Sequence, residues 1–154
     1  MNLFKFSKNT PNSFLNNNEK VLELKDVYKF YNNTNNEELE VLNSINFTIH
    51  RGNFYCVLGP SGCGKTTLLN IIAGFIPHSD GEVLMKGSPI KKPGKDRCVI
   101  FQEDTLFPWL TVNENISFGL KHGGFVFDDM DEKVEYYLSL VGLDGYGNYI
   151  PKEI

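Results

Sequence analysis

The stretch that decides the fold is Gly59-Pro60-Ser61-Gly62-Cys63-Gly64-Lys65-Thr66, which matches the pattern Gly-x-x-x-x-Gly-Lys-Ser/Thr at every fixed position. Its glycines let the backbone curl tightly, so that successive N–H groups of residues 62–66 point into one cavity and attract an anion. A helix that begins here adds the partial positive charge of its N-terminus, and Lys65 adds a full charge. The hydroxyl of Thr66 suits Mg²⁺. The stretch therefore predicts a site for the phosphate groups of a nucleotide.

The residues on either side of this loop predict a strand before it and a helix after it. Phe54–Leu58 are apolar at every position, which favours a strand covered on both faces, as in a parallel sheet flanked by helices. Lys65–Ala73 carry apolar residues at helical spacing, and Gly74 is a natural end for that helix. This context disfavours the alternative of a plain glycine-rich turn without a ligand.

Apolar patterns elsewhere in the chain indicate further strands and two helices. The expected strands are Val21–Tyr31, Ile45–Ile49, Gly81–Gly87 and Cys98–Phe101. Thr111 to Glu114 has the form of a capping box, which starts a helix that runs to about Leu120. Another helix is expected from about Asp129 to Val141, because acidic residues lie at its start and a glycine follows it. The pattern is that of an α/β protein.

Length, charge and cysteine content limit the class of protein. The chain has 154 residues and a formal net charge of −4, and its lysines and arginines are scattered, which excludes a nucleic-acid-binding surface. No apolar run approaches the roughly 18 residues that cross a bilayer. Residues 1–20 are rich in Asn and Ser and are expected to form a disordered leader. The three cysteines lack metal-like spacing and indicate reduced thiols inside the cell.

Four blocks of sequence resemble the ATP-binding subunit of ABC transporters. These blocks are Thr66-Thr67-Leu68-Leu69-Asn70-Ile71-Ile72-Ala73-Gly74, Gly81-Glu82-Val83, Val99-Ile100-Phe101-Gln102-Glu103-Asp104 and Pro108-Trp109-Leu110-Thr111-Val112-Asn113-Glu114-Asn115-Ile116. The last two look like the Q-loop region of importers for nitrate, sulfonates, taurine and similar small solutes. The resemblance covers residues 21–154. It implies an incomplete P-loop NTPase core of the RecA-like type, with an N-terminal antiparallel β region and the start of a helical subdomain from about residue 110.

The resemblance also implies roles for individual residues. Lys65 and the loop amides would hold the β- and γ-phosphates of ATP, with Thr67 close to the α-phosphate. Thr66 and Gln102 would share the Mg²⁺ ion, and Gln102 would also lie near the attacking water. The remaining loop residues expected to bind the nucleotide are Gly59, Pro60, Ser61, Gly62, Cys63 and Gly64.

Aromatic residues have two implied roles in this family. Tyr31 would stack on the adenine ring, with Tyr28 as the alternative, although Tyr31 could instead only cover the sheet. Phe107, Pro108 and Trp109 would border the groove that receives the membrane permease subunit, or they could be plain core. Through the permease the chain would be peripheral at the cytoplasmic face of the cell membrane.

The family pattern continues past the residues present here. Tyr149–Ile154 resembles the approach to the signature sequence Leu-Ser-Gly-Gly-Gln, and the signature, the Walker B strand with its catalytic glutamate and the switch histidine have no counterpart in the 154 residues. Phe125–Asp129 imitates Walker B, but an acidic helix start is the preferred interpretation. We therefore expect the chain to bind Mg-ATP, to lack hydrolysis on its own, and to pair in the family with a second ATP-binding subunit. We also expect poor stability if the polypeptide ends at Ile154.

Three functional hypotheses follow from these features. The first is the energy-coupling ATPase subunit of a solute importer, of which these residues form the N-terminal part. The second is a nucleotide-binding remnant or regulatory module that binds ATP without turnover. The third, a GTPase or a small-molecule kinase, is disfavoured because the chain has no Asn-Lys-x-Asp guanine motif and the Gln102 block fits neither class. The transported solute is not encoded in this chain.

Overall fold

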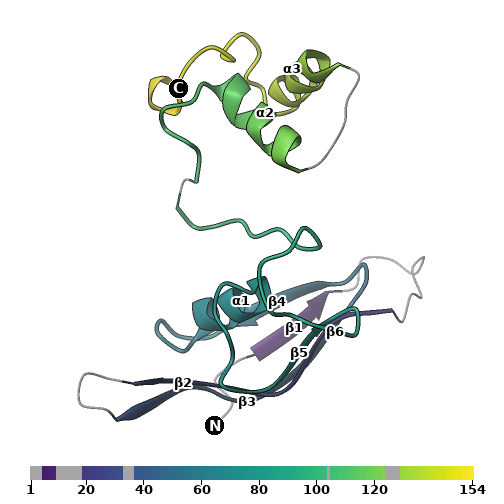
Figure 1. The fold of residues 1–154 in the computed structure, drawn as a ribbon, viewed down its shortest axis with the longest axis vertical. Helices are drawn as coiled ribbons and strands as arrows, with labels where there is room; N and C mark the ends of the chain where they lie inside the picture. The colour runs from purple at the N-terminus through teal and green to yellow at the C-terminus, as the bar shows by residue number, and fades with distance from the viewer. Residues whose placement is uncertain (1–4, 10–18, 33–36, 104, 124–128) are drawn as a thin grey trace. The chain divides into compact units, whose positions relative to one another are not determined.

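The computed structural model describes residues 5–9, 19–32, 37–103, 105–123 and 129–154. The chain forms two compact units, Met1–Cys98 and Val99–Ile154 (Figure 1). The first unit carries all the described strands and one helix, and the second unit carries the other helices. The phosphate-loop stretch lies in the first unit.

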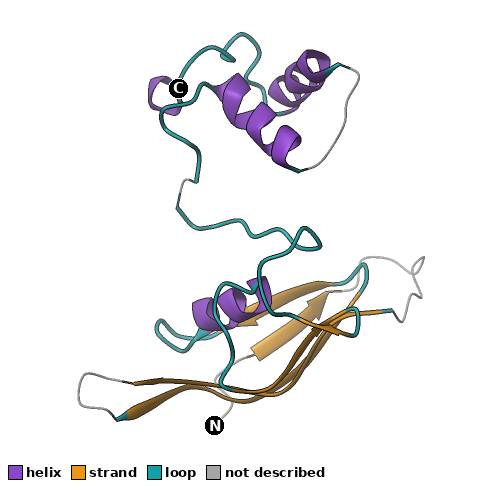
Figure 2. Ribbon diagram, viewed as in Figure 1, coloured by secondary structure: helices purple, strands orange, loops and turns teal. Residues whose placement is uncertain are grey.

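A four-stranded antiparallel sheet forms the larger layer of the first unit. β2 (Lys20–Asn32) pairs with β3 (Glu38–His50) on one side and with β5 (Asp80–Met85) on the other, and β6 (Ser88–Pro89) extends the sheet beyond β5 (Figure 2). The strands predicted in these regions are confirmed. β3 begins earlier than the predicted Ile45, because pairing with β2 continues the hairpin toward its tip.

The strand that leads into the phosphate loop differs from the sequence prediction. β4 (Phe54–Leu58) pairs antiparallel with β1 (Lys5–Asn9) rather than in a parallel sheet. Phe54 and Leu58 are 61% and 55% exposed, so the prediction that the strand is covered on both faces is wrong. The physical reason is that no parallel neighbour of β4 exists among the described residues, and its backbone groups pair with the strand that is present.

Part of residues 1–20 forms strands, which differs from the sequence prediction. Lys5–Asn9 is a strand, and β2 begins at Lys20, where the sequence predicted a disordered leader. A polar segment can pair in this way because the ladder is made by the main chain and does not depend on an apolar side-chain pattern. The rest of the predicted leader, residues 1–4 and 10–18, lies outside the described part of the chain.

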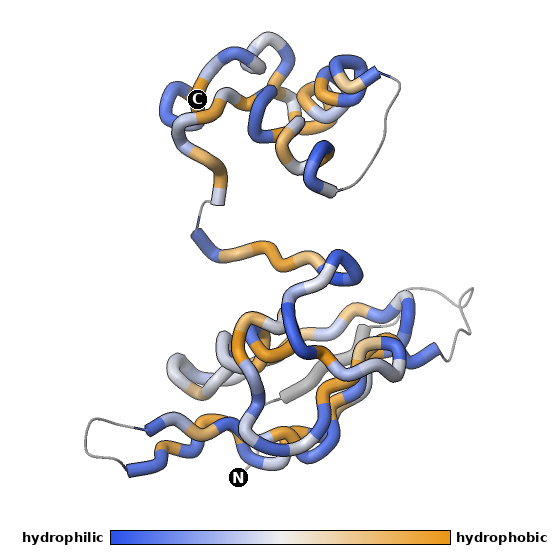
Figure 3. The backbone as a smooth tube through the Cα atoms, viewed as in Figure 1, coloured by the Kyte–Doolittle hydropathy of each residue, from blue (hydrophilic) through white to orange (hydrophobic). Residues whose placement is uncertain are grey.

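α1 (Lys65–Ala73) packs on the four-stranded sheet and ends where the sequence predicts. Its residues Leu68 and Ile71 are buried. They share one core with Leu22, Leu24, Val27, Leu42, Ile45 and Val83. The apolar stretches of the helix and strands are coloured orange in Figure 3. Gly74 caps the helix with φ of 81° and donates its N–H to the carbonyls of Asn70 and Ile71. The packing of α1 on this sheet sets the direction in which the helix N-terminus presents the phosphate loop.

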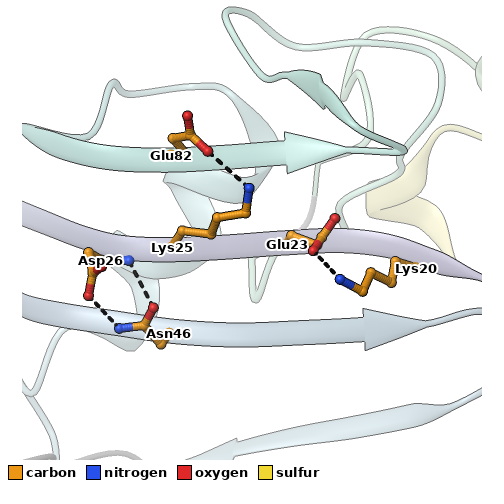
Figure 4. Close-up of polar contacts among 6 residues, drawn as sticks. All are labelled: Lys20, Glu23, Lys25, Asp26, Asn46 and Glu82. Atoms are coloured by element: carbon orange, nitrogen blue, oxygen red, sulfur yellow. Dashed lines mark hydrogen bonds and ion pairs between the residues drawn. The ribbon is translucent and has the colours of Figure 1, made fainter.

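The central strand of this sheet is irregular at Asp26. Asp26 has φ of 47°, and Ser44 on the neighbouring strand has φ of 46°. The Asp26 carboxylate accepts a hydrogen bond from Asn46 Nδ2 at 2.7 Å, and the Asp26 N–H donates to Asn46 Oδ1 at 3.0 Å (Figure 4). The carboxylate also accepts from Ser44 Oγ at 2.9 Å. On β5, which pairs with β2 on its other side, a Cβ at Gly81 would collide with the carbonyl oxygen of Asp26, so glycine allows the two strands to approach here. These contacts hold three strands in register across a pair of bulges.

Two α-helices and a short 3₁₀ turn, η1 (Pro151–Glu153), form the second unit. α2 (Val112–His122) begins with the predicted capping box, in which Thr111 Oγ1 accepts from the Glu114 N–H and a Glu114 carboxylate oxygen accepts from the Thr111 N–H. α3 (Met130–Leu140) is capped by Asp129, whose carboxylate accepts from the Glu132 N–H at 3.0 Å. The two helices share a small core made by Val112, Val134 and Leu138. Both predicted helices are confirmed.

The predicted strand Cys98–Phe101 is wrong. These residues have no strand assignment, and the side chains of Ile100 and Phe101 are 92% and 49% exposed. The apolar run is nevertheless visible in Figure 3 where the chain passes from the first unit to the second. An apolar sequence forms a strand only beside a partner for its backbone, and no described strand pairs with this segment.

None of the helices in the described ranges combines the length and the hydropathy that a bilayer crossing requires.

Candidate nucleotide-binding site

The loop between β4 and α1 curls through two glycines in the left-handed region. Gly62 has φ of 77° and Gly64 has φ of 97°. The Cys63 N–H donates to the Pro60 carbonyl at 3.4 Å and closes the turn. This is the tight curl that the glycine spacing predicts, since L side chains rarely adopt these backbone angles.

Gly64 is fixed against the sheet as well as being part of the loop. It is buried, and a Cβ at this position would lie 3.0 Å from the Val41 carbonyl oxygen and 3.0 Å from Leu42 Cδ2. β3 therefore supports the base of the loop from behind. This contact was not predicted from the sequence because the expected strand began only at Ile45, although the apolar pair Val41-Leu42 was a usable signal.

The N-terminus of α1 has no side-chain oxygen to accept hydrogen bonds from its first N–H groups, unlike the N-termini of α2 and α3. α2 and α3 are each capped by a side-chain oxygen, whereas the N-cap Gly64 provides no side-chain hydrogen bond and the first turn of α1 has no acidic residue. The helix instead begins with Lys65. A cation at a helix N-terminus adds to the positive end of the dipole, which is unfavourable unless an anion binds there. The arrangement therefore favours an anionic ligand.

The Lys65 ammonium group folds back over the loop. Its Nζ donates to the carbonyl of Gly59 at 2.9 Å and to that of Pro60 at 2.7 Å, and it lies 3.7 Å from Cys63 Sγ. Thr66 is exposed beside it, and Thr67 is half-buried. The structure thus brings the positive charge, the threonine hydroxyls and the helix N-terminus together at one end of α1. The ammonium group and the helix N-terminus suit the negative charge of a phosphate chain, and a threonine hydroxyl suits Mg²⁺.

Tyr31 lies at the end of β2 that is next to the phosphate loop. It pairs with Leu39 on β3, two residues before the Val41 carbonyl against which Gly64 packs. Its ring is 41% exposed, and Lys29 Nζ lies 4.9 Å from the ring centre. The alternative, Tyr28, is half-buried, and its ring is stacked 6.1 Å from that of Phe30. Tyr31 therefore has a more accessible ring than Tyr28.

Gln102 belongs to the second unit, whereas the loop belongs to the first. Its side chain is exposed. The shared Mg²⁺ ligation of Gln102 with Thr66 stays a prediction. Within the described parts of the chain, no group of three or more His, Cys, Asp or Glu residues is arranged to hold a metal ion.

The aromatic segment before α2 is partly exposed. Trp109 is 72% exposed, whereas Phe107 is half-buried. The Phe107 ring centre lies 5.6 Å from that of Trp109 and 4.6 Å from that of Phe118 on α2. Pro108 is exposed between them. Phe107 thus packs on the helix, and Trp109 and Pro108 face solvent, which differs from a fully buried core.

The second unit also contains an apolar cavity of about 490 Å³ beside α2 and α3. Its lining includes Leu106, Leu120 and Tyr137 and no charged side chain. A polyphosphate needs cationic groups and amide donors, so the chemistry of this cavity does not suit one. The loop of the first unit is the better nucleotide site.

Comparison with known proteins points to the same class of protein. The chain is 47% identical over 112 residues to the taurine import ATP-binding protein TauB of Pelagibacter ubique, covering 73% of the chain and 42% of TauB. It is 43% identical over 134 residues to the aliphatic sulfonates import ATP-binding protein SsuB of Bacillus cereus, covering 87% of the chain and 52% of SsuB. The chain spans about half the length of these curated relatives.

The fold prediction is confirmed by likeness to a solved cassette. The ATP-binding cassette MJ0796, in a dimeric post-hydrolysis state bound to ADP and Pi, matches with a TM-score of 0.69 and 26% identity, covering 86% of the chain and 62% of the cassette. The antiparallel sheet and α1 of this chain are thus part of an α/β core of the P-loop NTPase type. The family model described as ABC transporter matches residues 42–153, which include the phosphate loop, Gln102 and both helices of the second unit. With the sequence pattern, the loop geometry and these matches in agreement, the chain belongs to the ABC transporter family.

Proposed function

We propose that the chain is the ATP-binding, energy-coupling part of an ABC-type importer for a small solute. The observation that carries this proposal is the N-terminus of α1, which has no side-chain cap and lies beside Lys65 and two left-handed glycines, so that positive charge is concentrated there. The names of the relatives, which are import ATP-binding proteins, support the importer class. The chemistry that this site supports best is capture of a nucleotide polyphosphate.

The proposed role of each residue follows from its match to the family's sequence pattern. Lys65 and the main-chain N–H groups of residues 62–66 hold the β- and γ-phosphates, and Thr67 lies close to the α-phosphate. Thr66 and Gln102 hold Mg²⁺, which neutralises phosphate charge when it is bound. Tyr31 stacks on adenine, a role that its exposed ring next to the loop supports.

The proposed partners are a permease subunit and a second ATP-binding subunit. The exposed Pro108 and Trp109, beside the half-buried Phe107, form the proposed permease contact. Trp109 is 72% exposed, and an exposed tryptophan is a common anchor at protein interfaces. Through this contact the chain would be peripheral at the cytoplasmic face of the membrane.

A matched pair of lysine variants tests the phosphate site. Lys65→Ala should lower the affinity for a fluorescent Mg-ATP analogue at least about tenfold, because a charge-assisted contact to phosphate is lost. Lys91→Ala removes the same charge from an exposed position in the same unit and should leave the affinity unchanged. Thermal unfolding of each variant shows whether it is folded. Equal affinities for Lys65→Ala and the unmodified chain would remove the phosphate-loop assignment.

The second candidate function is a module that binds ATP without turnover. It is favoured by one observation, namely that Asp129, part of the segment that imitates Walker B, serves as the cap of α3. The rest of that segment, residues 125–128, lies outside the described residues. The genomic sequence after the Ile154 codon separates the two candidates. A downstream Ser-Gly-Gly followed by an apolar strand ending in Asp-Glu supports the importer subunit, and a stop codon without an adjacent remainder supports the module.

A further inference from the structure

The side chain of Asn115, in the first turns of α2, is bonded to the segment that precedes the helix. Asn115 Oδ1 accepts a hydrogen bond from the Phe107 N–H at 2.9 Å. Its Nδ2 lies 3.1 Å from the carbonyl oxygen of Phe107, 3.1 Å from that of Leu110 and 3.0 Å from that of Thr111, so these three acceptors share its two N–H groups. One half-buried amide thus binds both ends of a short segment.

These bonds close a turn with the tryptophan at its tip. The Leu110 N–H donates to the Phe107 carbonyl at 3.1 Å, so the four residues from Phe107 to Leu110 form a turn whose ends are both bonded to Asn115. Phe107 is further held by ring contact with Phe118 at 4.6 Å between centres. Trp109 is 72% exposed, and its ring contact is with Phe107 of the same turn, at 5.6 Å between centres, so its position depends on the turn.

We propose that Asn115 is a positioning residue that holds the Phe107–Leu110 turn in one shape and so presents Trp109 to the permease subunit. This inference rests on the proposed function, in which the turn contacts the permease. A turn that is ordered before docking loses less conformational entropy on binding, so Asn115 raises the affinity without touching the partner. Without its amide, the Phe107 N–H and the Leu110 carbonyl would lose their hydrogen bonds to the helix, and the turn would take several shapes.

The test replaces the donor group and retains the shape of the side chain. Asn115→Asp keeps an acceptor for the Phe107 N–H but directs a carboxylate oxygen at three carbonyls, and Asn115→Ala removes the contacts without repulsion. Asn148→Asp makes the same charge change at an exposed residue of the same unit and serves as the matched control. The chain has one tryptophan, so its fluorescence reports Trp109 alone.

Two measurements on the full chain report the turn directly. We expect both Asn115 variants to lower the fluorescence anisotropy of Trp109 and to speed amide exchange at residues 107–111 at least about tenfold, with exchange at residues 116–120 as in Asn148→Asp. A purely structural role in α2 would instead speed exchange along the whole helix. Unchanged anisotropy and exchange at the turn in both variants would overturn the inference.

Binding to the permease separates this inference from the proposed function. The probe is a purified permease subunit of an ABC-type importer from the same organism, in detergent, titrated with each variant. Asn115→Asp and Trp109→Ala should each weaken binding, and the double variant should be no weaker than Trp109→Ala alone, since both act through one side chain. If Trp109→Ala binds like the unmodified chain, the proposed permease contact fails, and with it the presentation of Trp109. If only Asn115→Asp weakens binding while the turn stays ordered, Asn115 does not act through the turn.

Discussion

The two left-handed glycines of the phosphate loop differ in what surrounds them. A Cβ at Gly64 would be pressed against Val41 and Leu42, whereas nothing lies within 4 Å of a Cβ at Gly62. An alanine at either position carries left-handed strain of about 1–2 kcal/mol. Gly64→Ala adds steric contact with the backbone of β3, which cannot move without disturbing the sheet.

We therefore expect Gly64→Ala to lower the free energy of unfolding more than Gly62→Ala does, by at least about 1 kcal/mol. Urea denaturation of the two variants and the unmodified chain measures the difference. Gly62→Ala is the control for strain without crowding. Equal losses of stability in the two variants would show that the contact between Gly64 and β3 has no energetic weight.

At the level of single residues, the sequence predicted which groups bind phosphate but not what supports them. The fixed spacing of Gly59, Gly64 and Lys65 has one chemical use, so their roles could be proposed directly. The bonds from Asn115 to the turn before α2 had no such signal, because an Asn in a helix has no preferred partner until the chain before it folds back.

At the level of elements, the four-stranded sheet of the first unit is stabilised by the carboxylate of Asp26, which lies where β2 is irregular in its pairing with both β3 and β5. Hydrogen bonds from Asn46, and then from Ser44, hold the pKa of the Asp26 carboxyl below its ordinary value of 3.8. Because the pKa is lowered in the folded state, the charged form stabilises the fold at all pH values above the unfolded pKa. That contribution is lost as the pH falls through the lower pKa of the folded state.

Asp26→Asn tests this contribution, because asparagine keeps the size and tolerates the left-handed backbone while removing the charge. The unmodified chain should have the higher free energy of unfolding at pH 7. The difference should shrink as the pH falls below about 4, where Asp26 begins to protonate in the unfolded chain while its lowered pKa keeps it charged in the folded state. Denaturation at several pH values measures it. Asp144→Asn, at an exposed position of the second unit, is the control and should show no such dependence. A difference that stays constant down to about pH 2.5 would mean that the charge of Asp26 contributes nothing.

Prediction at the element level worked where an element is determined by its own residues. The three α-helices have local signals in their spacing and in caps such as Thr111 and Asp129, and all three form. The two all-apolar segments, Phe54–Leu58 and Cys98–Phe101, were predicted as buried strands, and each differs from that prediction. Burial and pairing of a strand depend on neighbours that its own sequence does not specify.

At the level of the whole molecule, the described residues form two units, one that carries the binding loop and one that is helical. The carboxylate of Asp129 is engaged as a helix cap. Phosphoryl transfer depends on positioned charge and a positioned nucleophile, which the loop alone does not supply.

We expect the purified chain to bind Mg-ATP and to release phosphate no faster than a heat-denatured sample. A phosphate-release assay with Lys65→Ala alongside distinguishes the sources of any activity. Turnover that disappears in Lys65→Ala would contradict the expectation and would direct attention to Asp128 and Asp129, while turnover that persists in the variant would identify a contaminating ATPase.

The sequence by itself determined the chemistry of the loop, the positions of the helices and the family, because each depends on local spacing or on a motif that is complete within a few residues. The tertiary structure decided the rest: that β1 rather than a parallel strand pairs with β4, that Gly64 packs on β3, and that Asn115 holds the turn with Trp109. Each of these features is a contact between two segments, which either lie far apart in the sequence or meet because the chain turns back on itself. Hydrogen-bond partners of that kind are selected by what lies nearby in space, which the order of residues does not state.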